Sequence, residues 1–306
     1  MSELKHPTSD QPAAEATAGT DASTSTEWLD RLIAAKRTDT AAGREPYAAH
    51  LDKPLAEGEP TAREVLDRFD PRRANLPDLT PTDAVRYIET HAADRPWLAP
   101  VRGHDTAVQR LFATLDQGHG HALERHEGYP SDSLLQRRVQ YLEDPAQLDL
   151  TKRLAGEDAY KPGKDHQCAE VATKIGDPEA FATAFARGME HPDVRAVLDQ
   201  PLRKGSPPSP VAIPIGELLG ADGARYCSGY QLRLVGGDIK ATTDCRTAWV
   251  DAYRQGREPD APAPIAVPID NFQNTTVRFV FAPDRAKARY EVFTMYVDPP
   301  PTEEDS

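Results

Sequence analysis

Apolar residues recur at helical spacing through the first two thirds of the chain. Residues three and four positions apart share one face of a helix, so this pattern predicts a succession of helices, each with one buried side. Thr80-Pro81 and Asp177-Pro178 combine a capping residue with a proline at the first helical position, and they mark two helix starts. The predicted helices cover 61–69, a segment from Thr80, 105–115, 131–142, 166–175, 177–189 and a short segment through 194–198.

The pattern changes after the proline-rich stretch at 206–210. Short runs follow that are apolar or alternate between apolar and polar side chains, which is typical of strands. Residues 282–285 contain Pro and Asp between the last two runs, and they predict a hairpin turn. The predicted strands cover 211–215, 230–235, 265–269, 276–281 and 290–297. Helices followed by strands predict an α+β fold, with N-terminal helices and then an antiparallel sheet.

The N-terminal end has a different composition. Residues 1–26 are rich in Ser, Thr, Ala, Pro and acidic side chains and contain almost no large apolar group. Such a segment cannot bury enough surface to offset its chain entropy, so we predict disorder there. Residues 27–36, with Trp28, predict one short amphipathic helix. The predicted division is a tail at 1–58, a small helical region at 59–117, a larger domain at 118–299 and an acidic tail at 300–306.

The charge balance limits the kinds of partner. The 36 Lys and Arg residues and 49 Asp and Glu residues give a net charge of −13. This balance argues against the broad basic surface of many nucleic-acid-binding domains, so an RNA site would have to be a local positive patch. The chain has no apolar run of about 18 residues and no N-terminal signal pattern. We therefore expect no membrane partner, and the localisation stays open.

The cysteines give no metal or redox motif. Cys168, Cys227 and Cys245 include no CxxC pair, which argues against a zinc ribbon. Free buried thiols are the commoner interpretation, and one disulfide between Cys227 and Cys245 is the alternative. We predict no cofactor.

The candidate chemistry lies in the stretch from 118 to 138, GHGHALERHEGYPSDSLLQRR. Three histidines, His119, His121 and His126, precede a predicted helix that carries Arg137 and Arg138. Imidazole exchanges protons near neutral pH, and guanidinium binds phosphate or carboxylate oxygens with two parallel hydrogen bonds. Together they suit cleavage of a phosphodiester.

Two segments of this chain match a family pattern. The first is Gly120-His121, four residues, His126-x-Gly128 and a helix with Arg137. The second is Val292-Phe293-Thr294-Met295-Tyr296 near the end of the chain. Together they resemble the RNase A-like toxin domain at the C-termini of bacterial contact-dependent inhibition (CdiA-type) proteins, over 118–299. Two departures stand out: Glu127 replaces a valine, and 149–165 and 245–263 look like insertions.

The resemblance implies an RNase A-like domain that acts as a ribonuclease toxin without a metal ion. It places the active site at His126, Arg137, Thr294 and Tyr296, and His121 is the candidate second proton carrier. Transesterification by the 2′-hydroxyl would leave a 2′,3′-cyclic phosphate. The implied partners are an RNA substrate, for which tRNA is one candidate, and a cognate immunity protein. The implied place of action is a cytoplasm, that of the producing cell or of a target cell.

Alternative interpretations stay open. Arg137 could be a solvated helix residue paired with Glu124 or Glu127, and Arg138 is the candidate one position further on. Thr294 and Tyr296 are also residue types that favour strands. A metal-dependent hydrolase would use His119, His121 and His126, or His166 with Cys168, although no standard zinc spacing occurs. A non-catalytic acidic α+β interaction protein is the other alternative, and the net charge favours it.

Overall fold

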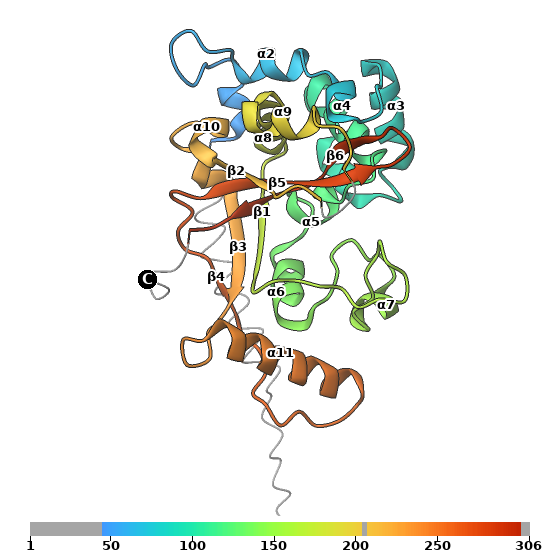
Figure 1. Ribbon diagram of the computed structural model, residues 1–306, viewed down its shortest axis with the longest axis vertical. Helices are drawn as coiled ribbons and strands as arrows, with labels where there is room; N and C mark the ends of the chain where they lie inside the picture. Colours follow the sequence, from blue (N-terminus) through green and yellow to red (C-terminus); the bar gives the residue numbers. More distant parts are fainter. Residues whose placement is uncertain (1–44, 204–206, 301–306) are drawn as a thin grey trace, which may run out of the picture. The chain divides into compact units, whose positions relative to one another are not determined.

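The computed structural model describes residues 45–203 and 207–300 (Figure 1). The helix predicted at 27–36 and the acidic end from 301 lie outside the described residues. The predicted order is confirmed: helices dominate the N-terminal part, and antiparallel strands follow. The fold is therefore α+β. No described helix is long and apolar enough to cross a membrane.

The first part of the described chain is helical. Its elements are η1 (Tyr47–His50), α2 (Ala62–Asp67), η2 (Pro71–Ala74), α3 (Pro81–His91), η3 (Pro96–Val101) and α4 (Thr106–Asp116). Next come α5 (Ala122–His126), α6 (Asp132–Tyr141), α7 (Leu150–Leu154), α8 (Pro178–Glu190) and α9 (Pro192–Leu198). The later helical elements are α10 (Ile215–Leu219), η4 (Gly223–Tyr226) and α11 (Ile239–Arg254).

Capping side chains start several of these helices where the sequence predicts them. The side chain of Thr80 accepts the Asp83 N–H at the start of α3, and Asp177 accepts the Ala180 N–H at the start of α8. Ser131 accepts the Leu134 N–H at the start of α6. Each cap satisfies an N–H that has no partner within the helix, so these boundaries were predictable.

The strands form two three-stranded antiparallel sheets. One has the order β1 (Val171–Ile175), β3 (Cys227–Leu232) and β4 (Ala266–Pro268). The other has the order β2 (Val211–Pro214), β5 (Thr276–Asp284) and β6 (Arg289–Asp298). The predicted hairpin joins β5 to β6, but both strands extend further than predicted. Asp284 still pairs with Arg289, so the turn lies at 285–288 rather than at 282–285.

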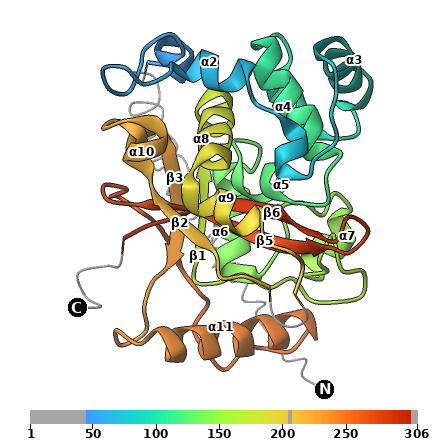
Figure 2. The same ribbon diagram turned by 45° about the horizontal axis from the view of Figure 1, so that its top comes forward.

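The main core lies between the helices and the β2–β5–β6 sheet. Phe181 and Phe185 of α8 contact Phe112 of α4, Phe69 and Phe279 of β5. Figures 1 and 2 show α8 on one side of this sheet and α6 on the other. A second, smaller apolar cluster joins α6 to the other sheet through Leu135, Val139, Ala172, Tyr230 and Leu232. From Pro46 onward the chain forms one unit.

Two predicted segments were wrong. Residues 166–175 were predicted as a helix, but Val171–Ile175 is strand β1 and pairs with β3. The short run Val-Ala-Thr-Lys-Ile contains two β-branched residues at its ends and one in the middle, which suit a half-buried strand. In the second segment, helix α11 occupies Ile239–Arg254, part of which was predicted as an inserted loop. All three cysteines are free thiols, so the alternative disulfide between Cys227 and Cys245 is not formed.

A matched pair of glycines tests the packing of α8 on the sheet. A Cβ on Gly188 would lie 2.0 Å from Cζ of Phe279, whereas a Cβ on Gly216 of α10 would meet nothing within 4 Å. We expect Gly188→Ala to lower the free energy of unfolding by roughly 1–3 kcal/mol, because it overpacks the core. Gly216→Ala should be neutral or slightly stabilising, because alanine favours helix. Urea unfolding of both variants measures the difference, and an equal effect of the two would contradict this account of the core.

Candidate functional site

The histidine segment is held against β6 by a close backbone approach. A Cβ on Gly120 would lie 2.3 Å from the carbonyl oxygen of Phe293, so only glycine fits there. The next residue, His121, donates its backbone N–H to the same carbonyl at 3.2 Å. Gly128 closes the other end of the segment, because a Cβ there would lie 2.9 Å from the Gly176 carbonyl oxygen. The two glycines of the motif therefore fix short helix α5 between β6 and the end of β1.

A β-bulge in β6 shapes this contact. The register of β5 and β6 shifts between Val280, which pairs with Thr294, and Phe281, which pairs with Val292. Phe293 is the extra residue, and a bulge bends its strand and redirects its side chain. The Phe293 ring meets the His121 ring edge-on, with centroids 4.7 Å apart. The bulge thus gives His121 both its backbone partner and its aromatic neighbour.

His126 lies between His121 and the last strand. Its ring centroid is 6.0 Å from that of His121 and 5.5 Å from that of Tyr296. Its Nδ1 lies 3.4 Å from the Thr173 carbonyl oxygen, which suits an Nδ1–H donor. Nε2 is then the nitrogen left without a hydrogen bond to any residue that the structure describes. The structure therefore brings together His121, His126 and Tyr296, three of the five predicted site residues.

Thr294 lies on the same strand, close to the first turn of α5. It lines a small cavity together with Gly120, Ala122 and Glu124. Its Oγ1 is buried and has no hydrogen-bond partner within the described chain. Thr294 and Tyr296 flank Met295, whose side chain is in the main core, so both lie on the opposite face of β6. The Thr294 hydroxyl therefore lies beside the histidine segment without a hydrogen-bond partner among the described residues.

Two buried guanidinium groups, those of Arg125 and Arg138, act electrostatically on the histidines. Arg138 is buried, and its charge is among the causes that lower the pKa of both His121 and His126. Arg137 instead makes an ion pair with Glu143 and lies over the ring of Tyr141, 5.4 Å from its centroid. Side chains of consecutive helix residues point about 100° apart, so the neighbours Arg137 and Arg138 lie in different surroundings. The predicted Arg137 therefore lies in a different environment from the histidine pair.

The hydrogen bonds of Arg138 leave part of its guanidinium unused. Nε donates to Nε2 of His166 at 3.3 Å, and Nη1 donates to the Arg125 carbonyl oxygen at 3.4 Å. Nη2 has no hydrogen-bond partner in the described part of the chain. Arg138 makes no direct ion pair there, so its charge and one of its donors can serve an anion.

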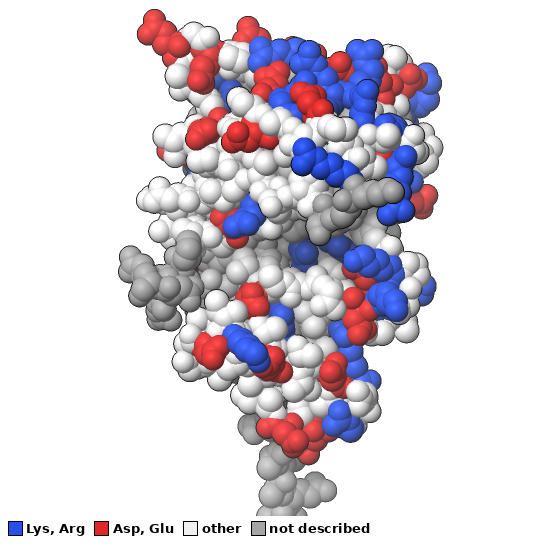
Figure 3. Space-filling view, in the orientation of Figure 1, with Lys and Arg blue, Asp and Glu red and all other residues white. Residues whose placement is uncertain are grey.

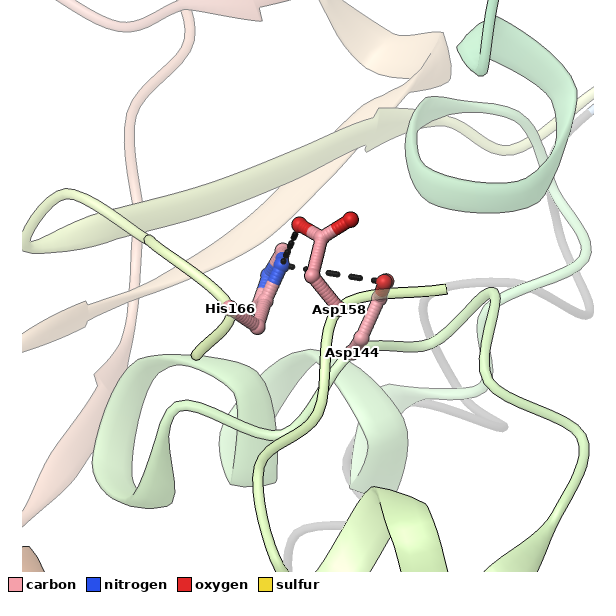
Figure 4. Close-up of side chains that lie close together, drawn as sticks. All are labelled: Asp144, Asp158 and His166. Carbon is pink, nitrogen blue, oxygen red and sulfur yellow. Dashed lines mark hydrogen bonds and ion pairs between the residues drawn. The ribbon is translucent and has the colours of Figure 1, made fainter. Parts of the chain in front are cut away.

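A buried polar cluster, which the sequence did not predict, holds Arg138 in place. It consists of Arg125, Asp144, Asp158 and His166. Arg125 donates to Asp144 at 2.8 Å and to Asp158 at 3.1 Å. His166 Nδ1 lies 3.2 Å from Asp158, so its other nitrogen accepts from Arg138. Figure 4 shows the two carboxyl groups converging on His166. Asp144, Asp158 and His166 come from irregular segments, where no pattern marks them.

The electrostatics of the site keep its histidines neutral. Burial lowers the pKa of His121 to about 3, helped by the nearby charges of Arg125 and Arg138. Burial and then Arg138 hold the pKa of His126 well below its usual value. Burial raises the pKa of the neighbouring Glu127 carboxyl to about 8, so this carboxyl is largely protonated at neutral pH and adds little negative charge beside His126. Both imidazoles are accordingly neutral at neutral pH, and they are weaker bases than an exposed histidine.

The metal alternatives find little support in the donor groups. Asp144, Asp158 and His166 are the one group of three potential ligands found among the described residues, with ligand atoms within 4.8 Å of one another. The guanidinium of Arg125 already lies against both carboxylates, and a cation would compete with it. His119 has a largely exposed side chain and faces Glu291 at 3.3 Å. Cys168 donates to the Val171 carbonyl oxygen. These potential ligand groups are therefore better suited to an internal ion-pair network than to a metal site.

Comparison with known proteins found no matching family model, curated protein or solved structure. The resemblance to the RNase A-like toxin domain therefore stays a prediction.

The buried carboxyl of Glu127 gives a test of the site's electrostatics. Its folded pKa of about 8 exceeds the ordinary 4.5, so its contribution to stability is present below about pH 4.5 and is lost as the pH rises through 8. We expect Glu127→Gln, which resembles the protonated acid, to gain stability relative to wild type as the pH rises from 5 to 8. Exposed Glu57→Gln is the control. Urea unfolding at several pH values measures this, and parallel curves for wild type and Glu127→Gln would contradict the pKa shift.

Proposed function

We propose that the protein is a metal-independent ribonuclease that cleaves RNA by transesterification. The observation that carries the proposal is the position of the His126 ring, 5.5 Å from Tyr296 and 6.0 Å from His121. Residues from two segments some 170 positions apart meet there, and the arginine beside them has a free donor. A proton acceptor, a second proton carrier and a guanidinium are the groups that this reaction needs, and the Tyr296 phenol adds a hydrogen-bond donor.

The proposed reaction needs two proton transfers. His126, which is neutral, takes the proton of the ribose 2′-hydroxyl, and the 2′-oxygen attacks phosphorus. The bond from phosphorus to the 5′-oxygen breaks, and the leaving oxygen takes a proton from His121, the second proton carrier, which is protonated while the phosphate is bound. His126 keeps the proton of the 2′-hydroxyl, so the number of protons on the site is unchanged. The products are a 2′,3′-cyclic phosphate and a 5′-hydroxyl. Thr294 Oγ1, which has no partner among the described residues, is the hydroxyl that we assign to a phosphate oxygen.

The geometry favours Arg138 over Arg137 as the group that stabilises the charge on phosphorus. Nη2 of Arg138 is unoccupied, whereas the Arg137 guanidinium is paired with Glu143. In the family pattern the arginine follows the histidine by eleven positions, and here the proposed residue follows it by twelve. The proposal therefore keeps an arginine that stabilises the charge on phosphorus, but it assigns this role to Arg138 instead of Arg137.

The residues that cover the site indicate the side from which a substrate can enter. The ring of Tyr160 lies 5.5 Å from that of His121 and covers it from the 144–166 segment. Tyr296 is half-buried, whereas Thr294 is buried. We therefore propose that RNA approaches from the side of Tyr296, whose ring can stack on a base. Toxin activity and a cognate immunity protein belong to the same proposal through the family resemblance.

The burial of His126 and Arg138 supports a second candidate function. His126 and Arg138 are only 8% and 7% exposed, which suits a polar network that fixes the packing of α5 and α6. In that case the protein is a non-catalytic acidic α+β interaction protein. The two candidates differ in one measurable property, because only the first predicts cleavage of RNA.

Single substitutions test the ribonuclease proposal. In the presence of EDTA, wild type should cleave tRNA or total RNA to products with a 2′,3′-cyclic phosphate end. We expect His126→Ala to lower the rate by on the order of 10²-fold or more, because it removes the proton acceptor. His119→Ala is the matched control, since this histidine belongs to the same segment and its side chain is 74% exposed. No cleavage by folded wild type on any RNA tested would favour the non-catalytic candidate.

Substitutions of the two adjacent arginines test whether Arg137 or Arg138 acts on the phosphate. Arg138→Lys keeps the charge but loses the forked geometry, and it should lower the cleavage rate by roughly 10-fold to 100-fold. Arg137→Lys should leave the rate within about twofold, because this residue faces Glu143. Thermal melts identify any variant that fails to fold. A large loss for Arg137→Lys together with a small one for Arg138→Lys would overturn the assignment.

A further inference from the structure

A second polar site lies away from the histidines, in a pocket of about 200 Å³. We call it the arginine pocket. Its walls come from η2 and the residue after it, from α9 and from the first residues of β6. The polar residues that line it are Arg72, Arg73, Asn75, Arg195, Arg289 and Asp199, and Leu198 and Tyr290 complete the wall.

The charge of this pocket is opposite to that of the whole chain. Four arginines and one aspartate line it, in a protein with a net charge of −13. Arg72 is engaged with Asp70 at 2.9 Å, and Arg195 lies 3.6 Å from Asp199. Arg73 and Arg289 make no ion pair with any described residue. Figure 3 shows Lys and Arg side chains at the top of the view, over α2 and α4, with acidic side chains among them.

Asn75 gives an independent sign that the pocket receives a ligand. It caps η2 in the left-handed conformation, with φ 64°, which asparagine tolerates better than most residues. Its carbonyl oxygen accepts a hydrogen bond from Lys287 Nζ at 2.6 Å, which fixes its backbone. The residue is 9% exposed, and its Nδ2 atom is buried and has no partner among the described residues. A buried donor without an acceptor costs free energy unless a ligand supplies one.

We propose that the arginine pocket binds a phosphate group. Arg73 and Arg289 supply guanidinium groups that are not neutralised by a carboxylate, and such groups bind phosphate oxygens with two hydrogen bonds. Asn75 Nδ2 supplies a neutral donor at the wall. The Tyr290 hydroxyl oxygen accepts the Arg203 N–H at 3.2 Å, which holds the Tyr290 ring as a wall of the pocket.

The arginine pocket lies on strand β6, which also carries residues of the candidate site, but the phosphate proposal does not depend on that site. Arg289 begins the strand that carries Thr294 five residues later. At about 3.4 Å per residue, the two are separated by roughly 17 Å along the strand. The phosphate could therefore belong to an RNA chain that continues toward the histidines, or to a small phosphorylated molecule. The chemistry of the pocket is the same for both sources.

Pyrophosphate is the probe for the first test, by isothermal titration at low ionic strength with the full chain. We expect wild type to bind it and the double variant Arg73→Gln/Arg289→Gln to bind at least about tenfold more weakly. The control, Arg86→Gln/Arg233→Gln, removes the same charge from exposed positions outside the pocket and should change affinity by less than about twofold. An absence of binding by wild type, or an equal loss in the control, would overturn the proposal.

Asn75→Gly isolates the buried donor. Glycine keeps the left-handed backbone and removes only the amide, so the variant should fold, and a thermal melt checks this. We expect weaker pyrophosphate binding by several-fold, because one hydrogen bond to a charged group is lost. Unchanged affinity in a folded variant would remove Asn75 from the site and contradict the argument from its unused donor.

A second arm identifies the source of the phosphate. A short RNA oligonucleotide is titrated into the His126→Ala protein, with and without the Arg73→Gln/Arg289→Gln pair. Loss of RNA affinity with the pair supports a phosphate of an RNA backbone. Retained RNA affinity with lost pyrophosphate binding supports a small phosphorylated ligand. Neither result depends on whether the wild type cleaves RNA.

Discussion

The contact between the Gly120–His121 backbone and the Phe293 carbonyl fixes the geometry around which the candidate site is built. It joins a five-residue helix, too short to be stable alone, to a strand of the main sheet. The bulge at Phe293 makes the contact possible because it turns a carbonyl of β6 toward α5. His126, one turn and a half further along, is thereby held next to Tyr296. The position of the imidazoles therefore depends on backbone geometry in two segments far apart in the sequence, and a side chain at Gly120 would disturb both.

The same helix connects the site to a network of buried charges. Arg125 lies between the two histidines in sequence and points into the cluster with Asp144 and Asp158. Burial alone would raise the pKa of Asp144, but the Arg125 guanidinium holds it at about 2, so the pair stays ionised. Removing one member would leave a charge buried without its partner, which is far costlier than never having had the pair. This network therefore fixes α5, the irregular 143–166 segment and, through His166, the guanidinium of Arg138.

Local chemistry explains which features were predictable from the sequence. Caps such as Ser131 and Asp177 act on residues three positions away, so they mark helix starts without any tertiary information. Strand β1 was missed because its five residues carry no helix-breaking signal and acquire a partner only from β3, some 55 residues later. The spatial meeting of His126 and Tyr296 was anticipated by the motif, whereas the choice between Arg137 and Arg138 was not. That choice depends on the rotation of α6 about its axis, which Leu135 and Val139 set by packing on the second sheet. Asp144 and Asp158 lie in irregular segments, where spacing carries no structural information.

The lowered pKa values of the histidines have a consequence for any anion that enters. His121 and His126 are neutral because burial and two guanidinium groups disfavour the imidazolium form. A phosphate placed among them would neutralise part of the Arg138 field and add a negative charge of its own, and both changes raise the proton affinity of imidazole. Anion binding and imidazole protonation would thus favour each other. In the empty site both imidazoles are neutral and weakly basic, whereas one of them can hold a proton when an anion is bound. The site would then offer one proton acceptor and one proton donor, within a small region of positive potential in an acidic protein.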